Sequence, residues 1–175
     1  ISYPAGFVLV CAMNPCPCGY YRHPTRACRC SMSDIRRYFN KLSGPILNRI
    51  DLQVELSPER PDQILAGAAG ESSDAILKRV ESARAVQDRR FGVQGRTNGQ
   101  MSPSEIRSAC SLSPDCSSVL EAALRRMNLS PRSLEKVIKV SRTIADLAGV
   151  PQILPDHIME SVRFRAMDML TTVAG

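Results

Sequence analysis

The sequence predicts an α/β segment that extends to about residue 57, followed by an all-helical region, so that the chain is mostly helical overall. A continuous apolar run over residues 6–13 and an alternating run over residues 50–56 are both typical of β-strands. From about residue 72 onward, apolar residues recur every three or four positions, which is the spacing of an amphipathic helix.

The composition is that of an ordinary globular chain of 175 residues, with 43% hydrophobic and 23% charged residues. No apolar run approaches the roughly 20 residues needed to span a bilayer, and no leader precedes a cleavage site, so we expect no membrane partner. Aromatic residues make up only 5% and Trp is absent, which argues against a surface rich in rings that stack on bases. The start at Ile1, inside an apolar stretch, leads us to expect a fragment of a longer protein.

The first strand, predicted at residues 6–13, ends at Asn14-Pro15. Sheets of α/β proteins bind ligands beyond their strand ends, which makes Asn14 a candidate site residue. An ordinary Asn-Pro turn is the alternative.

Four of the seven cysteines lie within fifteen positions, in a stretch whose proline and glycine residues predict a loop: Cys16, Cys18, Cys28 and Cys30. A disulfide framework would spread its bridges along the chain, so this clustering indicates a metal site in a reducing, cytoplasmic compartment. Four thiolates around a tetrahedral ion suit zinc. Four reduced cysteines without a metal are the alternative, and His23 between the two pairs could replace one thiol.

Ser33-Asp34 can begin a basic helix that continues to about Leu42. Residues 21–41 hold six cations and only one acid, Asp34, and account for most of the net charge of +6. Such a concentration favours a polyanionic partner, although a solvated face is the simpler alternative. The cations are Arg22, Arg26, Arg29, Arg36, Arg37 and Lys41.

The second strand, predicted at residues 50–56, is ended by Ser57-Pro58 and preceded by Arg49 between apolar residues. A surface arginine paired with Asp51 is the alternative to a functional role for Arg49.

Five helices are predicted after the second strand, with Ser and Pro residues that favour helix starts. They are predicted at 72 or 73 to about 91, in a short stretch opened by Ser102-Pro103, and at 114–127, 131–148 and 155–170. In the first, Ile76, Val80, Ala83 and Val86 or Gln87 share a face. Arg132 lies in the first turn of the 131–148 helix, where a cation opposes the helix dipole, and is therefore another candidate.

Four strings taken together resemble one family. They are Phe7–Gly19, Leu42–Leu52, Leu129–Ser133 and Ser141–Leu147, and they are similar to the magnesium-chelatase-like AAA+ proteins of bacteria, the YifB/ComM family. The resemblance extends from Ala5 to about Asp168. This sequence differs from the family pattern at Asn48, where Asp is common, and at Gly99, where Ala is usual.

The resemblance implies a role for each candidate residue. Asn14 matches sensor 1, Arg49 matches the arginine finger that reaches a neighbouring subunit's nucleotide, and Arg132 matches the nucleotide-binding sensor 2 of the helical lid. The four cysteines match a zinc-binding insertion. These residue types suit phosphoryl transfer, which needs positioning and positive charge around the transferred group.

The resemblance also implies a domain division: 1–57 as the last part of a AAA+ P-loop core, 58–115 as linker helices and 116–175 as the helical lid. The first part would include the zinc insertion at 15–31 and the finger segment at 43–51. The chain contains no phosphate-binding loop and no magnesium-binding acidic motif. We therefore expect it to be the C-terminal part of a AAA+ module and to be inactive as an ATPase alone, with ATP and Mg bound by the full-length protein.

The function that the resemblance implies is a ring-forming, hexameric, ATP-driven motor acting on DNA, as a helicase in branch migration, recombination or DNA uptake for competence. A chelatase-type motor that inserts magnesium into a porphyrin is one alternative. A stand-alone zinc-dependent nucleic-acid-binding module is another.

Overall fold

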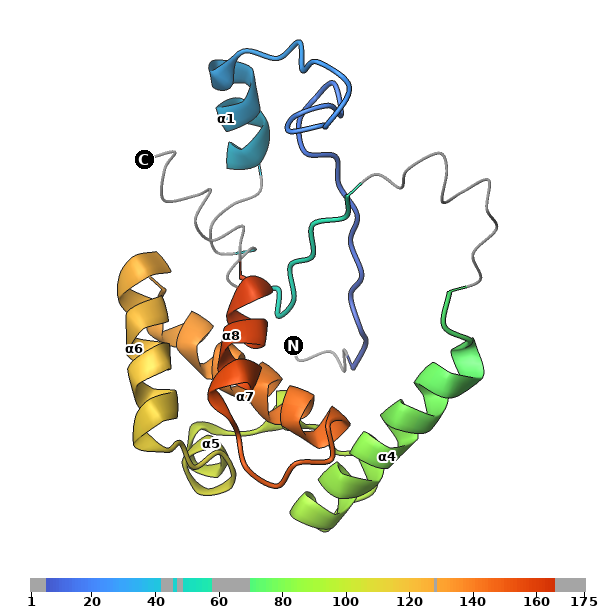
Figure 1. Cartoon of the computed structure of the whole chain (residues 1–175), viewed down its shortest axis with the longest axis vertical. Helices are drawn as coiled ribbons and strands as arrows, with labels where there is room; N and C mark the ends of the chain where they lie inside the picture. Colours follow the sequence, from blue (N-terminus) through green and yellow to red (C-terminus); the bar gives the residue numbers. More distant parts are fainter. Residues whose placement is uncertain (1–5, 42–45, 47–48, 58–69, 128, 166–175) are drawn as a thin grey trace, which may run out of the picture. The chain divides into compact units, whose positions relative to one another are not determined.

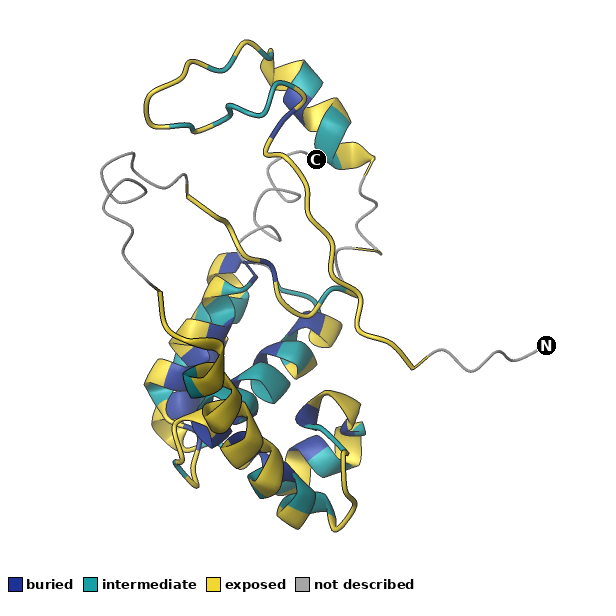
Figure 2. Ribbon diagram, turned by 90° about the vertical axis from the view of Figure 1, so that its right-hand side faces the viewer, coloured by how far each residue is buried: buried dark blue, intermediate teal, exposed yellow. Residues whose placement is uncertain are grey.

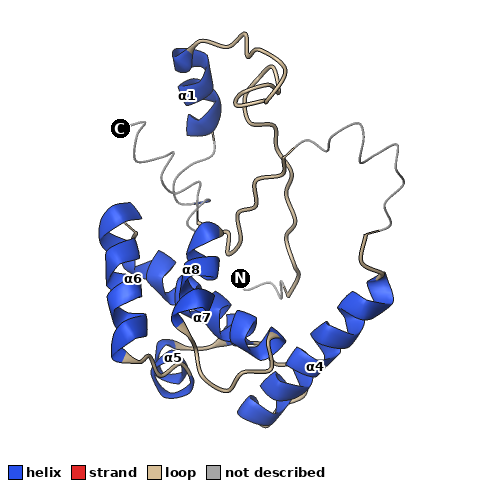
Figure 3. Cartoon of the chain, viewed as in Figure 1, coloured by secondary structure: helices blue, strands red, loops and turns tan. Residues whose placement is uncertain are grey.

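The computed structural model describes residues 6–41, 46, 49–57, 70–127 and 129–165. In these residues it contains six α-helices and one short 3₁₀ helix, and no β-strand (Figure 3). The chain divides into two compact units, Ile1–Ser43 and Gly44–Gly175, each described here by itself (Figure 1). The prediction of a mostly helical chain is confirmed.

The first unit contains one helix, α1 (Met32–Asn40), which follows the cysteine loop directly. Its N-cap is Ser31, two residues before the predicted start at Ser33. The Ser31 side chain accepts a hydrogen bond from the Asp34 backbone, and the Asp34 carboxylate accepts one from the Ser31 backbone. This reciprocal capping box satisfies two backbone donors at once and fixes where the helix begins.

In the second unit, α4 (Ser73–Phe91) and α5 (Pro103–Ala109) begin where their caps predict, at Ser72 and Ser102. The α4 helix ends at Gly92, whose φ of 62° is a left-handed conformation that glycine adopts without strain. A short 3₁₀ turn, η1 (Asn98–Gln100), lies between them.

The last three helices are α6 (Pro114–Met127), α7 (Pro131–Leu147) and α8 (Pro155–Arg163). The predictions at 114–127 and 131–148 are confirmed to within one residue. The helix predicted at 155–170 ends earlier, at Arg163, and its positions beyond 165 lie outside the described residues.

Helix α7 is the centre of this unit and packs against α8, α4, α5 and η1, while α6 packs against α8. In Figure 2 the buried residues, coloured dark blue on the ribbon, are concentrated in these helices. The buried cluster consists of Met101, Ile106, Cys110, Cys116, Leu120, Val137, Ile153 and Ile158. Burial of apolar side chains therefore stabilises the helical region from within.

The predicted inner face of α4 is only partly correct. Ala83 and Gln87 are buried, but Ile76 and Val80 are 43% and 40% exposed. Only the C-terminal half of α4 packs against the rest of the described chain.

The two strands predicted at 6–13 and 50–56 are wrong for the structure of this chain, because neither range forms a β-ladder. A strand needs a neighbouring strand to pair with its backbone groups, and no described segment forms such a ladder with either range. Val8 and Val10 are 89% and 87% exposed. In the second range Gln53 is buried while Leu52, Val54 and Leu56 are exposed, so the alternating apolar residues do not form a buried face. The α/β sheet fragment is thus not shown by the described residues.

Among the described helices, none has the length and apolar character required to cross a bilayer.

Candidate functional site

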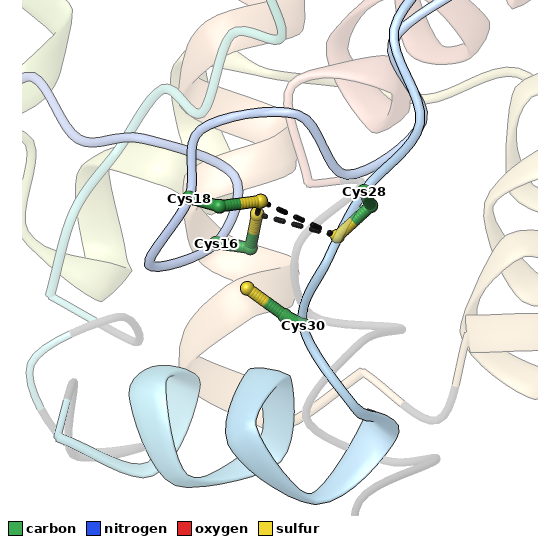
Figure 4. Close-up of side chains that lie close together, drawn as sticks. All are labelled: Cys16, Cys18, Cys28 and Cys30. Carbon is green, nitrogen blue, oxygen red and sulfur yellow. Dashed lines mark hydrogen bonds between the residues drawn. The ribbon is translucent and has the colours of Figure 1, made fainter.

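The four clustered cysteines lie close together in the loop before α1, as Figure 4 shows. All four Sγ atoms lie within 4.8 Å of one another. The Cys16 Sγ atom is 3.4 Å from that of Cys18 and 3.7 Å from that of Cys28, and the Cys18 and Cys28 sulfurs are 3.6 Å apart. All four thiols are free.

These separations fit a tetrahedral zinc site. With Zn–S bonds of about 2.3 Å, the sulfurs of a four-thiolate site are about 3.8 Å apart, whereas a disulfide requires about 2.05 Å. Four protein ligands leave no open coordination position, so zinc here would organise the loop rather than activate a water molecule. The predicted grouping of the cysteines is confirmed, and the group can hold a metal ion.

The loop backbone brings the sulfurs together. Gly19 has a φ of 81° and donates its N–H to the Cys16 carbonyl at 3.0 Å, which closes a tight turn after the first cysteine pair. The Tyr21 N–H donates to the Cys16 Sγ atom at 3.3 Å. Cys16 itself is fully buried.

Two of the four thiols have pKa values shifted in opposite directions. Hydrogen bonding from the backbone of Arg29, and then of Tyr20, lowers the pKa of Cys18 to about 6. Desolvation raises the pKa of Cys30 to about 12. The protein by itself therefore favours a thiolate at Cys18 and opposes one at Cys30, and a bound cation would favour the thiolate form of its ligands.

His23 is not part of the cysteine group. Its Nδ1 atom accepts backbone hydrogen bonds from Thr25 at 3.2 Å and from Arg26 at 3.1 Å. These bonds stabilise the turn between the two cysteine pairs, so the alternative in which His23 replaces a thiol is not supported.

The candidate residues Asn14, Arg49 and Arg132 are all exposed. Asn14 belongs to the first unit and the two arginines to the second. Arg132 is the second residue of α7, immediately after Pro131.

A lysine that the sequence analysis missed connects the two arginine positions. The Lys136 ammonium donates to the carbonyl of Arg49 and forms an ion pair with Asp51 at 2.7 Å. Lys136 follows Arg132 by four positions on α7, which places both on one helix face. The backbone of Arg49 is therefore held against the helix that bears Arg132, and Asp51 pairs with Lys136 instead of with Arg49.

The segment after Arg49 is also anchored to α8 and the residues that follow it. Arg165, 1% exposed, donates to the carbonyl of Ile50 at 2.5 Å, and the Gln53 N–H donates to the carbonyl of Phe164 at 2.9 Å. Partners more than 80 positions away leave no signal in a single sequence. Only the four-residue spacing of Arg132 and Lys136 offered a local hint.

The string Ser141–Leu147, which contributes to the resemblance, has a structural role. The carboxylate of Asp146 accepts hydrogen bonds from Arg90 at 2.5 and 2.7 Å, from the Arg142 Nε atom at 3.1 Å and from the Asn98 side chain at 2.8 Å. Hydrogen bonding to Asp146 raises the pKa of Arg90. This buried network connects α4, η1 and α7.

Comparisons with known proteins cover both units. Residues 70–165 match the family described as magnesium chelatase, subunit ChlI C-terminal, and residues 1–64 match the family described as magnesium chelatase, subunit ChlI.

Among curated proteins, the uncharacterized protein YifB of Escherichia coli is 41% identical over 172 residues, which cover 97% of this chain and 33% of that protein. Competence protein ComM of Haemophilus influenzae is 41% identical over 169 residues, which cover 95% of this chain and 32% of that protein. An uncharacterized protein of Mycobacterium tuberculosis, Rv2897c, is 37% identical over 164 residues, or 93% of this chain and 32% of that protein. The chain spans about a third of the length of the curated relatives it matches.

Proposed function

Because the chain belongs to the magnesium-chelatase-like proteins of the YifB/ComM family, we propose that it forms the C-terminal part of a AAA+ module in an ATP-driven motor that acts on DNA. The observation that carries this proposal is that two exposed arginines, Arg49 and Arg132, lie in one unit on segments that contact each other. Lys136, on the same helix as Arg132, donates to the carbonyl of Arg49 and forms an ion pair with Asp51.

Each proposed contact follows from the chemistry of phosphoryl transfer, in which catalysis depends on positioning and on positive charge near the transferred group. A guanidinium offers donors in a rigid fork that matches phosphate oxygens. We assign Arg49 to the nucleotide of a neighbouring subunit and Arg132 to nucleotide binding from the lid. Asn14 would orient the attacking water. ATP and Mg would be held mainly by residues of the full-length protein outside this chain.

The proposed domain division follows the same assignment: a core part at 1–57, linker helices at 58–115 and a lid at 116–175. The two family matches, at 1–64 and 70–165, meet between residues 64 and 70, several positions after the proposed boundary at 57. The four cysteines would bind one zinc ion with a structural role, because a closed four-thiolate site fits their spacing.

DNA is proposed as the partner on two grounds. The relative in Haemophilus influenzae is named a competence protein, and six cations against one acid in residues 21–41 provide a surface for a polyanion. We propose a hexameric ring and a cytoplasmic location on the same family grounds. A helicase role in branch migration, recombination or DNA uptake follows from these assignments.

The decisive experiment measures ATP hydrolysis by the full-length protein with and without DNA. We expect DNA to stimulate hydrolysis, and we expect Arg49→Ala to bind ATP but to lose turnover by roughly 10³-fold or more. Arg89→Ala, an exposed arginine on α4, is the matched control and should retain activity. Mixing Arg49→Ala subunits with subunits defective in the phosphate-binding loop should restore part of the activity at hybrid interfaces.

Full activity of Arg49→Ala would show that the arginine is not a finger. DNA binding without DNA-stimulated hydrolysis would favour the stand-alone zinc-dependent nucleic-acid-binding module. Magnesium insertion into a porphyrin by the full-length protein would favour the chelatase-type motor.

A further inference from the structure

A shallow, largely open cleft of about 420 Å³ lies beside the cysteine cluster, and residues of α1 line one side of it. Its walls include the two cluster members Cys18 and Cys30 and three cations. We call it the basic cleft, and its cations are Arg29, Arg37 and Lys41. All three are exposed, and within the described part of the chain none of them forms a salt bridge.

The one carboxylate in the basic cleft, Asp34, is already engaged. Its Oδ2 atom accepts hydrogen bonds from the Ser31 hydroxyl at 2.6 Å and from the Ser31 N–H at 3.2 Å. These bonds lower the pKa of Asp34 and fix it in the cap of α1. The carboxylate therefore stabilises the helix start, while the three cations stay available to an external anion.

The positive charge around the cluster is also larger than the negative charge of a zinc ion bound by four thiolates. A zinc ion bound by four thiolates has a formal charge of −2. The six cations of residues 21–41, together with the single carboxylate Asp34 and this double negative charge, leave a net charge of +3 around the cluster. An anionic ligand can thus be attracted even when the metal site is filled.

Aromatic rings lie among these cations. The Arg26 guanidinium lies 5.2 Å from the centre of the Tyr20 ring and donates to its hydroxyl at 2.8 Å. The Arg22 guanidinium lies 5.4 Å from the centre of the Tyr21 ring. The half-buried Tyr38 lines the basic cleft itself.

The low aromatic content is therefore misleading as an argument against base stacking. The chain has four Tyr and four Phe residues, and half of these eight rings lie in one short stretch of the first unit: Tyr20, Tyr21, Tyr38 and Phe39. Cations that follow a phosphate backbone, interleaved with rings on which bases can stack, are the features that bind single strands without sequence preference.

We propose that the first unit binds single-stranded DNA, with backbone phosphates in the basic cleft at Arg29, Arg37 and Lys41 and bases against the neighbouring tyrosines. This inference rests on the proposed DNA function and assigns its contact surface. In this proposal the cysteine cluster positions a DNA contact, because it fixes the conformation of the loop that contains Arg29.

The test measures binding of the 175-residue chain, loaded with zinc, to a fluorescent oligothymidine of about 16 nucleotides over a range of salt concentrations. Each phosphate contact to a single strand contributes about 0.7 to the slope of log K against log salt. The triple variant Arg29→Gln/Arg37→Gln/Lys41→Gln should lower that slope by about 2 and weaken binding on the order of 100-fold at low salt. The charge-preserving variant Arg29→Lys/Arg37→Lys should keep most of the slope.

The matched control removes the same charge from exposed arginines of the second unit, as Arg84→Gln/Arg89→Gln/Arg107→Gln. It should change the slope by well under 1. Equal losses in the two triple variants would overturn the proposal, because they would indicate attraction by net charge alone. Loss of zinc from the Arg29/Arg37/Lys41 variant, measured by competition with a chelator, would also overturn the proposal. It would show that these cations serve to stabilise the negatively charged zinc–thiolate group.

Three measurements on the unmodified chain also test whether the basic cleft binds single-stranded DNA. A slope below about 1 is too small for three phosphate contacts and would overturn the proposal. Equal affinity for poly-glutamate would indicate an acidic protein partner instead, and a clear preference for RNA of the same length would assign the cleft to RNA. If the chain fails to bind while DNA still stimulates ATP hydrolysis by the full-length protein, the contact surface is wrong and the proposed function stands.

Discussion

The two units of this chain are held together by different interactions. In the described part of Ile1–Ser43, only Cys16 and Ile35 are buried. The unit Gly44–Gly175 contains a cluster of buried apolar residues around α7 and a buried network centred on Asp146. A unit with almost no apolar core needs another source of stability, and the cysteine cluster is the available one.

This contrast teaches that two units of one chain can depend on unrelated interactions for their stability. Zinc binding would supply free energy to the first unit at one point, through four side chains in one loop. In the second unit the stabilising contacts come from several helices. Loss of the metal should therefore unfold the first unit in one step. In the second unit, each substitution should lower the free energy of unfolding by an amount that depends on the contacts it removes.

The largest expected effect is that of metal removal. Structural zinc sites contribute about 10–16 kcal/mol of binding free energy at neutral pH, so chelation or Cys16→Ser should abolish the fold of the cysteine loop and α1. Amide hydrogen exchange should show lost protection in residues 15–40 and unchanged protection in α6 to α8. Cys11→Ser is the matched control, since Cys11 is exposed and outside the cluster. Metal analysis that finds no zinc in protein purified under reducing conditions would contradict this prediction.

The next effect concerns the buried network of the second unit. Asp146→Ala would leave Arg142 buried without its carboxylate and would deprive Arg90 of its main partner. Removing one member of a buried ion pair typically destabilises a protein by 3–5 kcal/mol. Urea unfolding of the second unit should reveal this loss, while zinc content stays unchanged. Glu160→Ala, an exposed acid on α8, is the control, and an equal loss there would show that the network has no special role.

Short-range features of this structure could be predicted from the sequence. The starts of α4, α5 and α7 follow from Ser72, Ser102 and Ser130, whose hydroxyls cap the helices as expected. The cysteine group could be predicted for the same reason, because two closely spaced pairs in one loop can converge without help from distant residues. Even the error at α1 is local, since Ser31 and Ser33 are both acceptable caps.

Long-range features could not be predicted. Whether residues 50–56 form a strand depends on a partner elsewhere, and here Gln53 bonds to the carbonyl of Phe164 instead. The role of Asp146 required knowledge that Arg90 and Asn98 lie beside it. Arg49 and Arg132 were candidates from their local sequence, but their roles came from a family resemblance and stay predictions.

A smaller effect tests the contact that holds the Arg49 segment on α7. Lys136→Met should remove the charged donor to the Arg49 carbonyl and the ion pair with Asp51. A hydrogen bond to a charged group contributes about 1.5–3 kcal/mol, so amide exchange at Gln53 should accelerate by roughly tenfold to a hundredfold. Lys139→Met is the control, because Lys139 donates to Gly99 instead. Unchanged exchange at Gln53 in Lys136→Met would show that the other anchors suffice.

The smallest expected effect has the opposite sign and concerns Gly99, a residue of η1. An added Cβ atom at Gly99 would meet only the Thr97 Oγ1 atom, at 3.6 Å, which is an ordinary contact distance. Its backbone is not left-handed, so Gly99→Ala should stabilise the second unit by about 0.4–1 kcal/mol by restricting the unfolded chain. Gly149→Ala is the informative comparison, because Gly149 has a φ of 68° and the same change should destabilise the unit there. Urea unfolding of both variants measures the two signs side by side. Destabilisation by Gly99→Ala would mean that the turn joining α4 to α5 is more tightly packed than this geometry indicates.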